Sequence, residues 1–183
     1  MRKRRGFSSV KALTFAAMLT AMSVVIGIFC KNFMDFGGIF RVTFENLPII
    51  LSGIVFGPIV GGLVGAVSDM LSYMLSTQSL AISPIITLGA ASVGLVSGII
   101  SRYVIKKEGN AKIILSAAMS HLVGSIIIKS LGLYLYFGWA VFYRIPIYIG
   151  IMSVEIFVIC LMYKNKSFRR LIDTVKEKKK NDL

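Results

Sequence analysis

The chain has 183 residues, of which 56% are hydrophobic and only 16% are charged. A soluble domain carries about 25% charged residues, and a chain this short has too little interior to hide the remaining apolar surface. These figures exclude an ordinary soluble domain. The net charge of +13 does not indicate nucleic-acid binding, because the Lys and Arg residues lie between and outside the apolar blocks.

Taken in chain order, the apolar blocks predict six helices in the membrane, of which the second is short and the others are near the roughly 20 residues that cross a bilayer. The block Leu47–Val67 is almost uninterrupted, but Gly57 and Pro58 divide it, because proline breaks a helix. We therefore predict helices at Lys11–Cys30, Thr43–Phe56, Pro58–Leu75, Ser83–Ile105, Ala111–Tyr136 and Arg144–Tyr163. A basic segment at 1–10, read as retained and not as a cleaved signal peptide, precedes this domain at 11–164, and a basic tail at 165–183 follows it.

The distribution of basic residues supports an even number of spans. Seventeen of the 21 Lys and Arg residues lie in the N-terminal segment, around the loop after the fourth helix, and in the tail. Short cytoplasmic segments collect Lys and Arg. Six helices place all three clusters on one side, whereas five would divide them. We predict an all-α, multi-pass protein of the cell membrane with both termini cytoplasmic.

Charged side chains inside or at the outer ends of the spans are candidate functional residues, because a charge in a bilayer needs a partner or a cavity. Arg41 and Glu45 lie one helical turn apart at the entry to the second helix and can pair. Lys129 can pair with Glu155 or Asp69 simply to lower the free energy of its burial. Alternatively, the set lines a polar binding cavity near the outer leaflet. The full set is Arg41, Glu45, Asp69, Lys129, Arg144 and Glu155.

The sequence offers little support for catalysis or a cofactor. His121 is the single histidine, and we expect its ring to bond a neighbouring helix. Because no second His or Cys stands at a ligand spacing, no metal site is predicted. We find no nucleophile–base set, paired-carboxylate motif or phosphate-binding loop, so we expect neither an enzyme nor a bound cofactor.

Two patterns of small residues and one aromatic cluster leave alternatives open. Glycines at four-residue spacing, at 53–65 and 94–98, favour close packing of membrane helices within the chain. Ala17 and Ala21 in the first helix are equally consistent with docking another membrane protein. The aromatic cluster at 134–148 either forms an interfacial belt or stacks on a flat ligand ring.

Several stretches together resemble a known family. The sequence RVTFENLPI at 41–49 runs into GIVFGP at 53–58, GGLVGA at 61–66 and Asp69. The segments IKSLGL at 128–133 and RIPIY at 144–148 fit the same pattern. The chain resembles the substrate-binding (S) components of energy-coupling factor (ECF) transporters, most of all the folate type, over nearly its whole length. Ala17 and Ala21 resemble the alanine motif by which S components dock their coupling subunit.

The resemblance implies a six-helix S component that captures a vitamin, folate, with high affinity from outside. It implies delivery through a shared module of one transmembrane coupling subunit and two ATP-binding cassette ATPases, since this chain has no Walker sequence. We hypothesise that Glu45 or Glu155 accepts hydrogen bonds from the pterin edge. Arg41, Lys129 or Arg144 would bind the tail carboxylates. Loops near 76–81 and 137–143 are candidate lids.

Other functions remain open from the sequence. Within the family, the cargo can be riboflavin, a queuosine precursor or another heterocycle. A small membrane enzyme would need a catalytic set, and we find none. A stand-alone secondary transporter would usually show two related halves, and the chain has no internal repeat.

Overall fold

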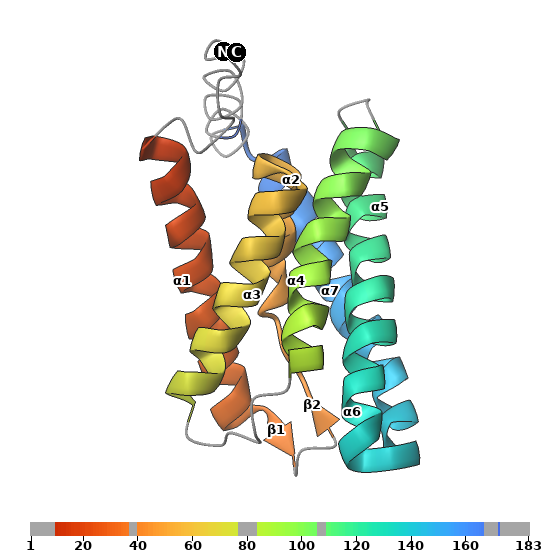
Figure 1. Cartoon of the computed structure of the whole chain (residues 1–183). Coiled ribbons are helices and arrows are strands. Elements are labelled where there is room, and N and C mark those ends of the chain that lie inside the picture. The colour runs from red at the N-terminus through yellow and green to blue at the C-terminus, as the bar shows by residue number, and fades with distance from the viewer. Residues whose placement is uncertain (1–9, 37–39, 77–83, 106–108, 167–171, 173–183) are drawn as a thin grey trace, which may run out of the picture.

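The computed structural model describes residues 10–36, 40–76, 84–105, 109–166 and 172. Its helices form one bundle (Figure 1). The elements are α1 Val10–Phe33, β1 Asp35–Phe36, β2 Phe40–Arg41, α2 Asn46–Phe56, α3 Pro58–Leu75, α4 Pro84–Ile99, η1 Ile100–Val104, α5 Asn110–Ser120, η2 His121–Lys129, α6 Ser130–Phe137, η3 Gly138–Tyr143 and α7 Arg144–Lys164. Because α4 runs into η1, α5 into η2 and α6, and η3 into α7, residues 10–164 as described contain the six helices that the apolar blocks predict.

The outer surface of this bundle suits a membrane. Five helices in the described part of the chain are long and apolar enough to cross a bilayer, and α2 is a shorter apolar helix of 11 residues. Large apolar side chains such as Phe33, Ile59 and Leu135 are 70–75% exposed, whereas several charged side chains are almost completely buried. This inverts the arrangement of a soluble protein and matches a protein whose solvent is lipid.

The two ends of the bundle differ in charge and structure. The start of α1, the end of η1, the start of α5 and the end of α7 lie at one end, which we call the basic end, while β1 and β2 lie at the other, the hairpin end (Figure 1). Arg102, Lys112 and Lys164 belong to the basic end. By the positive-inside rule we expect the basic end to face the cytoplasm.

The second helix begins later than the sequence analysis predicts. Residues 42–44 are not helical, and α2 starts at Asn46. A helix from Thr43 would place Pro48 in its interior, where the ring would clash with the carbonyl of Phe44. The chain instead rises as an extended segment from β2 into the bundle (Figure 1). The expectation that Arg41 lies one helical turn from Glu45 is therefore wrong.

Glycines bring α2, α3 and α4 into close contact, which confirms the packing interpretation of their four-residue spacing. A Cβ atom added to Gly94 would lie 2.0 Å from the carbonyl oxygen of Gly61, and one added to Gly53 would lie 1.9 Å from the Ser97 hydroxyl. Gly57, with φ of +94°, ends α2 beside Arg102, which donates a hydrogen bond to the Phe56 carbonyl. The tight turn between α2 and α3 thus requires glycine.

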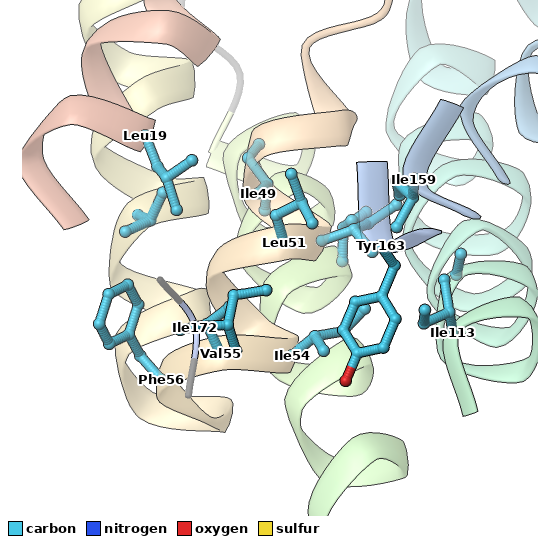
Figure 2. Packing of buried hydrophobic residues seen from close by; sticks show 14 of the residues in the cluster. Leu19, Ile49, Leu51, Ile54, Val55, Phe56, Ile113, Ile159, Tyr163 and Ile172 are labelled. Carbon is cyan, nitrogen blue, oxygen red and sulfur yellow. The ribbon is translucent and has the colours of Figure 1, made fainter. Parts of the chain in front are cut away.

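A hydrophobic cluster surrounds α2 and joins it to α5 and α7 (Figure 2). Ile49, Leu51 and Ile54 of α2 pack in this cluster with Ile113 and Ile159. Ile172, which lies in the predicted basic tail, is also fully buried there. The rest of the basic tail beyond 166 and the basic N-terminal segment lie outside the described residues.

Gly94→Ala is expected to destabilise the protein, because its methyl group would meet the backbone of α3. Overpacking of this kind has a typical effect of about 1–3 kcal/mol, or more against backbone. Thermal unfolding of the purified protein in detergent measures it. Gly150→Ala in α7 is the matched control, since an added Cβ there meets nothing within 4 Å. Equal unfolding temperatures for the two variants would contradict the packing described above.

Candidate functional site

Six charged residues in or beside the helices, five of them candidates from the sequence, are buried in the bundle. Each is at most 6% exposed. They balance in sign, with three cations and three carboxylates: Lys31, Lys129, Arg144, Glu45, Asp69 and Glu155. Burial at this level requires partners.

The ion pair between Lys129 and Glu45 lies at the centre of this set. Lys129 Nζ lies 3.2 Å from Glu45 Oε1 and donates a second hydrogen bond of 3.2 Å to Asn46 Oδ1. Two glycines give the pair room: a Cβ on Gly89 would lie 2.5 Å from Lys129 Cγ, and one on Gly27 would lie 2.9 Å from Glu45 Oε2. The pair therefore lies where α1, α2, α4 and η2 come together.

Lys129 forms its ion pair with Glu45, and not with Glu155 or Asp69, the partners that the sequence left open as an alternative to a binding cavity. The extended segment before α2 carries Glu45 into the bundle, and Ser23 of α1 holds it there by donating a 2.8 Å hydrogen bond to its carbonyl oxygen. A carboxylate that precedes a helix is also stabilised by the helix dipole. Glu45 is thus the acid that reaches Lys129.

Glu155 has a different partner. His121 Nε2 lies 2.5 Å from Glu155 Oε2, and both side chains are essentially unexposed. This confirms the expectation that the histidine ring bonds a neighbouring helix, here α7. Ser125 joins this pair to the first one, because its hydroxyl lies 3.4 Å from His121 Nδ1 and accepts a 3.4 Å hydrogen bond from Asn46 Nδ2.

Asp69 of α3 contributes the third carboxylate. Thr87 donates a 2.8 Å hydrogen bond to Asp69 Oδ2. The other oxygen, Oδ1, is buried without a hydrogen-bond partner among the described residues. Glu45, Lys129 and Lys31 lie close enough to act on Asp69 electrostatically. Asp69 therefore belongs to the same cluster and presents one acceptor that protein groups in the described part do not use.

Lys31, Tyr73 and Asn46 are site residues that the sequence analysis did not include. The ammonium group of Lys31, near the end of α1, lies 3.7 Å from the centroid of the Tyr73 ring. A cation over an aromatic face is stabilised when both are desolvated. One signal was available: Lys31 is among the four basic residues outside the three basic clusters. Asn46 had no such signal beyond following Glu45.

The remaining predicted residues lie nearer the hairpin end. Arg144 is the first residue of α7 and is 6% exposed. Tyr148, one turn later, is buried within electrostatic range of Lys129. The side chain of Arg41 lies outside the description, although its backbone pairs with Asp35 in the hairpin. Of the predicted lids, residues 77–83 are not described, and 138–143 form η3.

Aromatic side chains of α6 and η3 point outward. Trp139 is 76% exposed and stacks on Phe142 at 5.3 Å, while Tyr134 meets the Trp139 ring edge-on at 6.1 Å. An exposed, mutually stacked cluster at the end of a span is typical of an interfacial belt. These three rings therefore favour the belt over stacking on a ligand.

Ala17 and Ala21 of α1 are also exposed, whereas Ser23 and Gly27 of the same helix are buried toward Glu45. Helix α1 thus carries a small-residue stripe on one face and supports the buried cluster with another.

Sequence comparison decides the family. The family model described as "ECF transporter, substrate-specific component" matches residues 11–165. The chain belongs to this family. It is therefore an S component: a multi-pass membrane subunit that binds a substrate and works with an ECF module, and not an enzyme. The expected S-component nature and membrane location are confirmed.

Solved structures agree with this S-component fold. A crystal structure of FolT bound with folic acid has a TM-score of 0.67 and 24% sequence identity, over 87% of this chain and 98% of that one. A structure of the S component of a bacterial ECF transporter has a TM-score of 0.64 and 26% identity, over 91% of this chain and 98% of that one. No curated protein sequence matches the chain.

Proposed function

We propose that this S component captures folate or a close pterin relative at the buried cluster of Glu45, Asp69 and Lys129. The observation that carries this proposal is the buried Asp69 Oδ1, which has no hydrogen-bond partner in the described part of the chain and lies within electrostatic range of the Lys129 ammonium group that Glu45 neutralises. A pterin edge alternates hydrogen-bond donors with acceptors. A carboxylate next to a lysine offers the complementary acceptor and donor.

The rest of the folate molecule suits the surroundings of this cluster. Tyr73 and Tyr148 are buried aromatic side chains nearby, and flat rings stack well on such groups. The glutamate tail is anionic, and Arg144 is a buried cation nearer the hairpin end. Arginine binds carboxylates in a bidentate manner. The proposed ligand therefore lies with its ring at Asp69 and its tail toward Arg144. The likeness to FolT supports this choice of cargo.

The proposed route of delivery follows from the family. The hairpin end faces outside and admits the vitamin. The transmembrane coupling subunit docks on the exposed stripe of Ala17 and Ala21, and two ATP-binding cassette ATPases supply the energy. Riboflavin is the rival cargo, because its ring also carries donors and acceptors along one edge, but it lacks an anionic tail.

Binding of folic acid and of pterin, the ring without its tail, tests this assignment. Arg144→Met is expected to lower folic acid affinity roughly 10- to 100-fold, as for a lost hydrogen bond to a charged group, and to leave pterin affinity nearly unchanged. Isothermal titration of the purified protein measures both. Lys164→Met, an exposed cation at the basic end, is the control. An equal loss of affinity for both ligands would show that Arg144 does not bind the tail. Tight binding of riboflavin without binding of folic acid would show that folate is not the cargo.

A further inference from the structure

A single chain of hydrogen bonds connects Lys129 to Glu155 through the interior of the bundle. Lys129 Nζ donates to Asn46 Oδ1 at 3.2 Å, and Asn46 Nδ2 donates to Ser125 Oγ at 3.4 Å. Ser125 Oγ lies 3.4 Å from His121 Nδ1, and His121 Nε2 lies 2.5 Å from Glu155 Oε2. The five residues are at most 6% exposed, and they come from α2, η2 and α7.

The chemistry of the groups gives this chain one direction. With Glu155 ionised and the His121 ring neutral, the carboxylate only accepts, so Nε2 carries the hydrogen and Nδ1 accepts from the Ser125 hydroxyl. That hydroxyl oxygen is then free to accept from the Asn46 amide nitrogen. The amide oxygen must consequently face Lys129. Every donor points from Lys129 toward Glu155.

We propose that His121 and Glu155 are positioning residues for the substrate site and do not touch the substrate themselves. They fix the orientation of the Asn46 amide, and this amide fixes the ammonium group of Lys129. Without them the Ser125 hydroxyl can rotate and the amide can turn, which would direct its NH2 group at the ammonium. The inference rests on the proposed function, in that the substrate binds beside Lys129.

The alternative role for Glu155 is direct contact with the substrate. Its second oxygen, Oε1, is buried without a hydrogen-bond partner among the described residues. Direct contact between this oxygen and the substrate would also make Glu155 important for binding. The two roles differ in one respect. A residue that acts through the chain of hydrogen bonds no longer affects substrate affinity once another link of that chain has been removed.

A double-mutant cycle on folic acid binding makes this distinction. Ser125→Ala interrupts the chain of hydrogen bonds in its middle. His121→Phe with Glu155→Met removes its far end, and because both polar partners are replaced together, the loss of stability is limited. Each change is expected to lower affinity about 5- to 10-fold, and the combination is expected to lower it no further. Losses that multiply when combined would overturn the inference. Ser116→Ala, a buried serine of α5 outside the chain, should leave affinity unchanged.

The unfolding temperatures of the same variants without ligand separate this inference from the proposed function. If the unaltered protein fails to bind folic acid, folate is the wrong cargo. The double-mutant cycle is then evaluated from the unfolding temperatures alone. Shifts in unfolding temperature that are not additive would support a continuous chain of hydrogen bonds. Additive shifts would overturn it, because the two changes would then act independently.

Discussion

Lys129→Met is expected to abolish folic acid binding and to destabilise the protein by about 3–5 kcal/mol. The destabilisation arises because Glu45, which is 4% exposed, would be left as a buried charge without its ammonium partner. The loss of binding arises because the same ammonium group is the proposed donor beside Asp69. Thermal unfolding and calorimetric titration of the purified variant measure the two effects separately.

A second variant separates the fold from the site. Adding Glu45→Gln to Lys129→Met removes both charges, and replacing a buried ion pair with neutral groups is often close to neutral for stability. The double variant should therefore regain most of the lost stability and still fail to bind folic acid. Recovery of binding together with stability would show that the pair serves only the fold.

Ala17→Leu with Ala21→Leu is expected to abolish vitamin uptake by cells while leaving folic acid binding intact. Both alanines are exposed on α1, and a small surface allows two membrane helices to approach closely. Leucine would hold the coupling subunit away. Uptake of labelled folic acid and co-purification with the ECF module measure the loss.

Ala111→Leu supplies the matched control for the docking face, since it makes the same substitution at an exposed alanine of α5. Uptake by this variant should equal that of the unaltered chain. Normal uptake by the Ala17 and Ala21 variant would place the docking surface elsewhere.

Much of the bundle could be predicted from local features of the sequence. Six helices were predicted from the apolar blocks, the Gly57-Pro58 break and the three basic clusters. The bilayer determines the length of a span, and basic clusters on one side of the membrane require an even number of spans. The start of α2 was missed, although Pro48 carried the necessary signal. The proline clash argument applied at Gly57-Pro58 applies equally there.

The partners within the site could not be predicted in the same way. Residues 45 and 129, or 121 and 155, are far apart in the sequence, so their pairing depends on how the helices pack. Sequence position identified Glu45, Asp69, Lys129 and Glu155 as buried charges, because each lies in or beside an apolar block. It did not show that Glu45 would enter the bundle on an extended segment and form the ion pair with Lys129 in place of Asp69 or Glu155.

Mass spectrometry of the small molecules that the purified chain retains tests the central claim most directly. The account predicts a folate or a close pterin relative in near-stoichiometric amount. The same compound should be absent from the Lys129→Met, Glu45→Gln double variant. A flavin or another vitamin without a pterin ring, retained by the unaltered chain, would contradict the proposed cargo.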